Sequence, residues 1–546
     1  GVGILVTGRN VTIKNASVHG YKVGLLARNA PGLRIVGGDF SDNWKQHLAS
    51  TPEREDLSDW MSFHQNEKNE WLRYGAAIYL DGCDKFSITH TKTTGGQCGV
   101  MLNRSNRGII AGCDLSFLSG VGIGLYRSSE NNIQQNKIDW CVRGYSHGVY
   151  NRGQDSAGIL VYEQSSKNIF AYNSVTHGGD GFFLWAGQTT MDTGQGGCND
   201  NLVYGNDFSH SPTNGIEATF SRNTFANNKV FECWHGVWGG YSYGTKIVGN
   251  NFGYNAEAIA IEHGQHNLIA GNGFDHDNRA IRLWQNTKQD PDWGYPKHHD
   301  TDSHGYQITK NIYRTVLPDD YGTTRDVQER SNIHQAPPEA TMLPSGAPIL
   351  ATENSGYSDR FESAYWKPFT PEIAGIAAPK RLPGYKSPFL PATALRGRRY
   401  IVVDEWGPYD FKRPLLVPRE PLLPDGKPHL CELLGPAGTW QVKSTTPGVK
   451  LSATQGKIPG MVIVTLPATG NRAADVGVNL QYRSGNTQST FGVSRFIAPI
   501  HWSVAFYPWD KDTSDPRTEA DAFAKQLAGT PIATVKTDQL DFAGYG

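Results

Sequence analysis

Four short segments repeat one pattern, and each ends in an asparagine: NLVYGN (201–206), NTFANN (223–228), TKIVGN (245–250) and NLIAGN (267–272). Their last residues are spaced by 22 positions each time: Asn206, Asn228, Asn250 and Asn272. A second apolar run follows each segment: NGIEATF (214–220), HGVWGGY (235–241), EAIAIEH (257–263) and RAIRLWQ (279–285). Repetition at a fixed short period is the signature of a solenoid, in which every repeat is one structural unit.

One repeat of this length can form two or three short strands, each paired with its counterpart in the next repeat about 4.8 Å away. Alternation then points Ile, Val, Leu and Phe inward, and stacking many coils buries them. We expect the repeated asparagines to adopt the left-handed conformation at tight corners and to bond their counterparts in the adjacent coil. The period is too short for a four-stranded propeller blade, and the leucine framework of leucine-rich repeats is missing. The sequence therefore predicts an all-β fold, a right-handed parallel β-helix solenoid of roughly ten to twelve coils, followed by small β-sandwich domains.

The repeat and its end divide the sequence into four predicted regions. Residues 1–315 form the parallel β-helix, and residues 316–395, rich in Pro, Ser and Ala, form an extended segment packed along it. Residues 396–488 alternate as in an immunoglobulin-like β-sandwich. Residues 489–546 resemble the opening of a jelly-roll carbohydrate-binding module of the PA14 kind. Gly1 falls inside a repeat and DFAGYG inside a domain, so we expect the sequence to be trimmed at both ends.

Three insertions interrupt the period, at 42–74, 140–156 and 187–200. Insertions in a solenoid become loops, often on the face that binds a ligand. We expect the first to contain a short helix.

The composition excludes several classes of protein. Lys and Arg number 51 against 52 Asp and Glu, so no basic field exists to hold a nucleic acid. No apolar run is long enough to span a membrane. The seven cysteines show no CxxC spacing and are expected to be buried free thiols; the alternative is one disulfide from a loop cysteine such as Cys198. We expect no metal site and no cofactor; calcium alone stays open, because Asp510–Asp515 (DKDTSD) is similar to a calcium loop but lacks EF-hand spacing. The oligomeric state is not predicted.

These stacked repeats resemble the right-handed β-helix superfamily of pectate lyases, polygalacturonases, alginate-type lyases and NosD-like periplasmic proteins. The resemblance covers about 300 residues of the sequence. It implies a bacterial protein that is secreted or extracytoplasmic, in the periplasm or at the cell surface, with a polysaccharide as its partner. EHG (262–264), WHG (234–236) and IRL (281–283) do not make up the catalytic series of the polygalacturonases, and no pectate-lyase calcium site is present. Neither family's catalytic residues can therefore be transferred.

Aligning the second run of each coil gives two outward columns. The first contains Tyr79, Met101, Gly124, Leu160, Phe183, Glu217, Trp238, Ala260 and Arg282. The second contains Asp81, Asn103, Tyr126, Tyr162, Trp185, Thr219, Gly240, Glu262 and Trp284. Large aromatic side chains on an exposed face indicate stacking on sugar rings, unless an inserted loop or the 316–395 segment covers them.

The candidate catalytic residues are the carboxylates of this face. Glu217 and Glu262 lie two coils apart, on the order of 10 Å between backbones, close to the separation in inverting glycosidases. Asp180 and His235 are the reserve candidates. The candidate substrate-binding residues are Tyr126, Tyr162, Trp185, His210, Trp238, His263, Arg282 and Trp284.

The sequence thus favours a secreted carbohydrate-active enzyme that cleaves a polysaccharide, most simply a glycoside hydrolase with a carboxylate acid/base pair. A polysaccharide lyase is the enzymatic alternative, with Arg282 or Ca²⁺ neutralising an acidic sugar. The alternative from outside the enzymes is a non-catalytic extracellular β-helix with a structural or adhesive role. The outer faces of such a rod-shaped solenoid would carry ordinary polar side chains on all sides.

Overall fold

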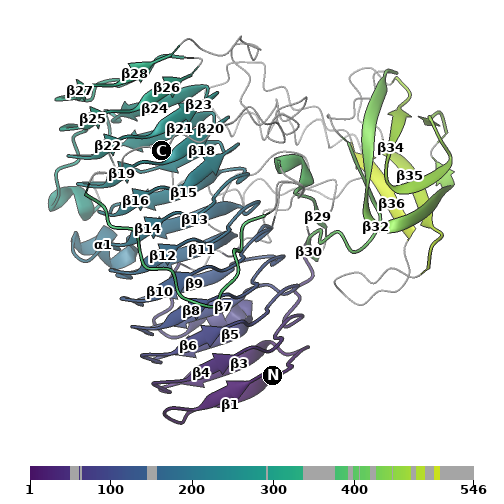
Figure 1. The fold of residues 1–546 in the computed structure, drawn as a ribbon, viewed down its shortest axis with the longest axis horizontal. Helices are drawn as coiled ribbons and strands as arrows, with labels where there is room; N and C mark the ends of the chain where they lie inside the picture. Colours follow the sequence, from purple (N-terminus) through teal and green to yellow (C-terminus); the bar gives the residue numbers. More distant parts are fainter. Residues whose placement is uncertain are drawn as a thin grey trace.

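The computed structural model describes residues 1–49, 61, 64–143, 156–289, 293–315, 317–335, 375–390, 397–404, 406–418, 426–445, 447–468, 475–485 and 497–503. The N-terminal part of the chain forms a column of stacked coils, and a separate antiparallel sheet lies beside it (Figure 1). Three parallel sheets, A, B and C, make up the walls of the column.

Sheet A contains 11 strands, and every pairing between them is parallel. In order they are β1 (Val2–Val6), β3 (Val23–Arg28), β5 (Ala76–Asp81), β7 (Val100–Asn103), β9 (Ile123–Tyr126), β11 (Ala157–Tyr162), β13 (Asp180–Trp185), β15 (Asn214–Thr219), β18 (His235–Trp238), β21 (Glu257–Glu262) and β24 (Arg279–Trp284).

Sheet B contains 12 short parallel strands: β2 (Thr12–Lys14), β4 (Arg34–Val36), β6 (Ser87–Thr89), β8 (Ile109–Ala111), β10 (Asn132–Gln134), β12 (Ile169–Ala171), β14 (Leu202–Tyr204), β16 (Thr224–Ala226), β19 (Lys246–Val248), β22 (Leu268–Ala270), β25 (Gln307–Thr309) and β27 (Gln328–Arg330). Sheet C contains five: β17 (Lys229–Phe231), β20 (Asn251–Gly253), β23 (Gly273–Asp275), β26 (Ile312–Arg314) and β28 (Ile333–His334). The predicted all-β, right-handed parallel β-helix is confirmed.

A continuous apolar core fills the column. The inward side chains of successive coils, such as Ile159, Phe182, Ile216, Val237 and Ile259, form one cluster of buried residues. A single coil has no second layer to cover its apolar face, so each coil depends on its neighbours for burial.

Asparagine side chains connect the coils at one corner. Asn228 Nδ2 donates to Asn250 Oδ1 (3.0 Å) and to the Val203 carbonyl (3.0 Å), and the Asn228 N–H donates to Asn250 Oδ1 (2.9 Å). The same bonds recur from Asn206 to Asn228 and from Asn250 to Asn272. The predicted bonding between adjacent coils is confirmed.

The expected left-handed conformation of these asparagines is wrong. The residue before each of them carries the positive φ instead: Gly205, Asn227, Gly249 and Gly271. The backbone turns one residue before each repeated asparagine. The asparagine side chain can therefore point inward and bond the asparagine of the next coil.

The parallel strands continue past residue 315, as far as β28. Residues 375–390 then run along the outer face of sheet B, where the Tyr172 hydroxyl donates to the Pro379 carbonyl (2.8 Å) and Tyr385 stacks on His90. This is the green trace that crosses the column in Figure 1. Residues 375–390 belong to the segment 316–395.

Residues 397–404 and 406–411 contact the turns of the column, where Trp140 Nε1 donates to the Tyr400 carbonyl (3.3 Å). This stretch contains η6 (Arg398–Tyr400), β29 (Val403–Asp404) and β30 (Gly407–Pro408). An antiparallel sheet follows, made of β31 (Leu415–Pro418), β32 (Pro428–Thr445), β33 (Lys450–Leu451), β34 (Gln455–Thr465), β35 (Asp475–Tyr482) and β36 (Ile497–Ser503). Because β36 pairs with β35, the described start of the 489–546 region belongs to this sheet; Asp510–Asp515 lies outside the described residues.

The insertions take different forms. The first contains the 3₁₀ helix η2 (Glu70–Tyr74), and the third contains α1 (Gln188–Thr193). The second lies mostly outside the described residues. A further 3₁₀ turn, η4 (Tyr295–Lys297), contacts α1. All seven cysteines are buried and free, as expected.

Replacing Asp277 with Asn is expected to stabilise the protein. Asp277 ends a second corner ladder: the Asn255 N–H and Nδ2 both donate to its Oδ1 (2.9 and 2.8 Å), while its buried Oδ2 has no hydrogen-bond partner among the described residues. Burial raises the pKa of Asp277 well above 3.8. The unfolded protein loses the Asp277 proton at a lower pH than the folded protein does. The free energy of unfolding therefore falls as the pH rises from the ordinary pKa of an aspartate toward the raised pKa of Asp277.

The Asp277→Asn variant removes this loss and supplies a donor, so it should gain about 1–3 kcal/mol near neutral pH. Thermal melts at about pH 5 and about pH 8 check this, because the gain should be larger at the higher pH. A gain that is equal at both pH values, or a loss, would contradict the account.

Candidate functional site

The strand register places the outward side chains of sheet A in the two columns expected from the sequence. Glu217 pairs with Trp238, Trp238 with Ala260, and Ala260 with Arg282. In the second column Glu262 pairs with Trp284. Residues that are 20 or more positions apart thus become neighbours, because each parallel strand lies about 4.8 Å from the next.

The N-terminal half of this face is covered. Residues 64–74 of the first insertion pack over it, and Trp71 contacts the rings of Tyr126 (5.5 Å) and Tyr162 (5.9 Å). Tyr126 and Tyr162 are only 1% and 2% exposed. Their predicted role in stacking on a sugar is therefore not supported, because the inserted segment already occupies their ring faces.

The C-terminal half of the face is more open. Trp238, Glu257, Glu262 and Trp284 are half-buried, and the Arg282 side chain is 45% exposed. These five residues, on β18, β21 and β24, are called the open face below. Trp185 is also half-buried and marks the border with the covered half.

A chain of polar side chains crosses four consecutive strands at this place. Arg282 Nη1 donates to Glu257 Oε1 (3.1 Å), and the other Glu257 oxygen lies 3.5 Å from His235 Nε2. His235 Nδ1 lies 2.9 Å from Asn214 Oδ1, and Asn214 Nδ2 donates to Glu217 Oε2 (2.7 Å). Both ring nitrogens of His235 thus face side-chain oxygen atoms, one of Glu257 and one of Asn214.

Glu217 is positioned to hold a proton. Its side chain is buried, and burial together with the negative charge of Asp180 raises the pKa of Glu217 well above 4.5. Asp180 Oδ1 accepts bonds from the Asn214 N–H (2.8 Å) and the Thr213 hydroxyl, which hold this carboxyl group beside Glu217.

Glu257 is positioned to stay ionised. Burial alone would raise its pKa, but the hydrogen bond and charge of His235, and then Arg282, outweigh burial and hold the pKa of Glu257 below 4.5. Glu257 is not among the candidate catalytic residues expected from the sequence. Its position in register with His235, on the strand that also carries Glu262, was the signal that could have found it.

Glu262 lies at the other edge of the open face. Trp284 Nε1 (3.1 Å) and Asn286 Nδ2 both donate to Glu262 Oε1, and burial raises the pKa of Glu262. The next residue, His263, is buried, and its Nδ1 bonds the Thr301 carbonyl (2.6 Å) while its Nε2 accepts the Asn286 N–H (3.0 Å). His263 therefore supports the loop behind Glu262 and is not available to a substrate.

His210 is also separate from the open face. It is buried in the turn before β15, with Nδ1 2.7 Å from Glu232 Oε2 and its ring against His177 (4.7 Å). Its predicted contact with substrate does not fit this burial. Aromatic contacts on the open face join Trp238 to His235 (4.9 Å) and to Trp284 (5.5 Å), and the Arg282 guanidinium lies over the Trp284 ring (4.6 Å).

Within the part of the chain that the structure describes, no three His, Cys, Asp or Glu side chains are arranged to hold a metal ion. The same part contains no helix that is long and apolar enough to cross a membrane.

Solved structures with a similar fold include two alginate enzymes and a surface adhesin. The periplasmic alginate epimerase AlgG is 11% identical, with a TM-score of 0.38, and the match covers 61% of this chain and 78% of that one. An alginate lyase from Paenibacillus sp. str. FPU-7 is 11% identical (TM-score 0.27; 61% and 98% covered). PfbA, a surface adhesin of Streptococcus pneumoniae, is 12% identical (TM-score 0.33; 52% and 64% covered).

No curated protein matches the sequence. One protein family does, over residues 2–214 and 193–291, which together span more than half of the 546 residues and almost all of sheet A. The chain therefore belongs to the family described as periplasmic copper-binding protein (NosD).

Proposed function

We propose that this protein is a polysaccharide-cleaving enzyme, a glycoside hydrolase, with Glu217 as the general acid and Glu257 as the general base. The observation that carries the proposal is the pair of opposite protonation states on one face: a raised pKa at Glu217 and a lowered pKa at Glu257. Two carboxyl groups with pKa values pushed apart are the requirement for acid/base cleavage of a glycosidic bond.

Glu217 lies on β15 and Glu257 on β21, with β18 between them. Glu217 is in register with Ala260, three residues after Glu257, so the two backbones are roughly 14 Å apart. The Glu217 carboxyl group reaches back to Asn214, which is in register with Glu257, and this shortens the separation of the two carboxyl groups. Inverting glycosidases hold their carboxyl groups about 6.5–9.5 Å apart, which leaves room for a water molecule. Glu217 would give its proton to the leaving sugar oxygen while Glu257 takes a proton from the attacking water, so that water is added across the broken bond.

The remaining residues of the open face suit a sugar ligand. Trp238 and Trp284 offer half-buried ring surfaces, and Glu262 and Arg282 offer hydrogen-bonding groups beside them. Asn214 and His235 connect the two carboxyl groups and fix their distance. Glu262, selected from the sequence as a catalytic partner, becomes a substrate contact in this proposal, because its own pKa is raised.

A polysaccharide lyase is the second candidate, and one observation favours it. The Arg282 side chain is 45% exposed and its guanidinium lies over the Trp284 ring (4.6 Å), where it could neutralise the carboxylate of an acidic sugar. A lyase leaves an unsaturated, ultraviolet-absorbing product, whereas a hydrolase does not.

The family description names copper and the periplasm. The described residues offer no cluster of three metal-binding side chains, and the seven buried thiols are not grouped with His or acidic residues, so they do not fit a protein-bound copper ion. No step of the proposed reaction uses copper. An extracytoplasmic location, in the periplasm or at the cell surface, agrees with the family description and with a polysaccharide as partner.

Glu217→Gln and Glu257→Gln are each expected to lower the rate of polysaccharide cleavage by about 10²–10⁴-fold, because each removes one proton-transfer group. The measurement is release of reducing ends from polygalacturonate, alginate, xylan and a mixed-linkage glucan, with ultraviolet absorbance followed in parallel. Glu130→Gln, on an exposed turn, is the matched control and should keep full activity.

Reducing ends without absorbance, lost in both variants, would support the hydrolase. Absorbance that rises with cleavage would favour the lyase. No cleavage of any of the four glycans would refute the proposed enzymatic function and would favour a non-catalytic structural or adhesive role.

The pH dependence of kcat/KM should be bell-shaped. Activity falls as the pH rises through the raised pKa of Glu217, because the acid loses its proton, and falls as the pH drops through the lowered pKa of Glu257, because the base gains one. Arg282→Gln removes a charge that lowers the pKa of Glu257, so the acidic limb should move to higher pH. The alkaline limb should stay in place, and a profile in which the acidic limb does not move would argue against Glu257 as the base.

A further inference from the structure

The segment that covers the N-terminal half of sheet A, residues 64–74, is called the clamp below. It contains η2 and packs across the outward side chains of β5, β7, β9, β11 and β13. Trp71 is buried among these side chains, and the His64 ring contacts Tyr162 (5.9 Å) and Trp185 (5.6 Å). The end of the clamp thus reaches the strand next to β15, which carries Glu217.

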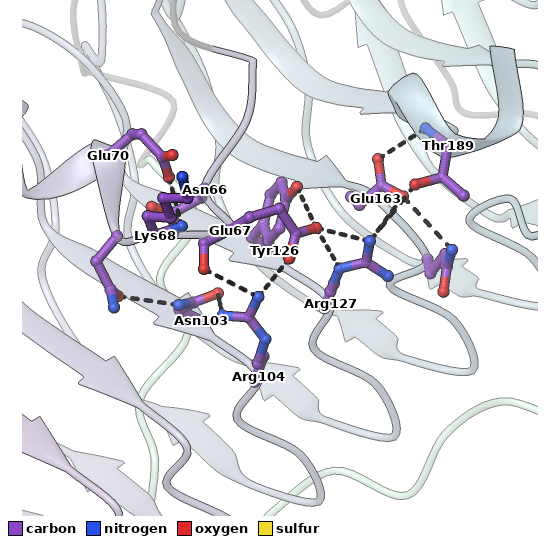
Figure 2. Close-up of polar contacts among 12 residues, drawn as sticks. Asn66, Glu67, Lys68, Glu70, Asn103, Arg104, Tyr126, Arg127, Glu163 and Thr189 are labelled. Carbon is purple, nitrogen blue, oxygen red and sulfur yellow. Dashed lines mark hydrogen bonds and ion pairs between the residues drawn. The ribbon is translucent and has the colours of Figure 1, made fainter. Parts of the chain in front are cut away.

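Polar bonds fasten the clamp to several coils (Figure 2). The Glu67 carboxylate accepts a bond from the Tyr126 hydroxyl (2.9 Å) and from Arg127 Nε (2.6 Å), and it also pairs with Arg104. Arg127 in turn lies 3.4 Å from Glu163, whose carboxylate accepts the Thr189 N–H (3.3 Å) at the start of α1.

The hydrogen bonds and charge of Arg127, with the Tyr126 hydroxyl and Arg104, outweigh burial and hold the pKa of Glu67 below 4.5. The Glu67 carboxylate thus joins side chains from two coils, and Arg127 extends the network to Glu163 on a third coil and to α1, which indicates a fixed wall.

Exposure along the first outward column changes abruptly at the end of the clamp. Tyr79, Met101, Leu160 and Phe183 are buried, whereas beyond Glu217 Trp238 is half-buried, the small Ala260 is buried and Arg282 is exposed. Glu217 lies between the two groups, in register with Phe183 on one side and Trp238 on the other. The proposed general acid therefore stands where the accessible surface ends.

We propose that the clamp makes this enzyme act on chain ends. A polysaccharide lying along the solenoid would enter over β24 and β21, with successive sugars near Trp284 and Trp238, and its terminal residue would stop against the clamp at Trp185. Only bonds near that end can then reach Glu217. This inference rests on the proposed function, and it adds the mode of cleavage and the residues that set it.

The first test uses wild-type protein and the best substrate among polygalacturonate, alginate, xylan and mixed-linkage glucan. Early products should be one short size, and the viscosity of the solution should stay nearly constant while reducing ends accumulate. An early fall in viscosity with products of many sizes would overturn the inference and leave the proposed function standing. No cleavage of any of the four would remove the proposed function, and the inference with it.

The second test loosens the clamp. Glu67→Ala removes its bonds to Tyr126, Arg104 and Arg127 at once, so internal cleavage should rise several-fold relative to terminal cleavage, with an early fall in viscosity. Arg107→Gln is the matched control, because it breaks only the ion pair with Asp84 on a turn of the same coils and should keep the wild-type product pattern. A Glu67→Ala enzyme that folds, cleaves and still releases only terminal products would refute the role of the clamp.

Discussion

Hydrogen bonding between successive coils is the constraint on which the rest of the structure depends. Each strand of sheets A, B and C is paired in parallel register with its counterpart one coil away, and buried asparagines bond from coil to coil at the corners. A coil that loses register exposes its core residues and leaves buried amides without partners, which costs free energy at every level of the stack. Once the first coils pair, the position of every outward side chain on the later coils is fixed.

This rigidity gives the candidate site its geometry. Side chains that are distant in sequence, such as Glu217, His235 and Glu257, stand on adjacent strands at a spacing that the backbone sets. A catalytic pair needs a defined separation, and a solenoid supplies it in steps of one strand spacing. The hydrogen-bonded chain from Glu217 to Arg282 then adds electrostatic differences that the backbone alone does not provide: Glu217 is buried beside Asp180, whereas Glu257 faces His235 and Arg282.

The insertions decide which outward side chains of the regular column are covered. The clamp converts half of an aromatic face into a second small core, in which Trp71, Tyr79, Tyr126 and Tyr162 are buried. The same kind of side chain stays accessible only a few coils further, at Trp238 and Trp284. Membership of the NosD family describes the solenoid, whereas the accessible chemistry depends on which part of the face an insertion covers.

The sequence by itself determined the solenoid, because the 22-residue spacing of Asn206, Asn228, Asn250 and Asn272 and the period-two alternation are local properties that any parallel stack must express. It also determined which side chains point outward and which of them share a column. It did not determine which outward residues meet solvent: Tyr126 and Trp284 look alike in the repeat, and only non-periodic contacts from residues 64–74 bury the first. Nor did it determine the protonation of Glu217 and Glu257, because pKa values depend on burial and on neighbouring charges that come together only when the coils are stacked.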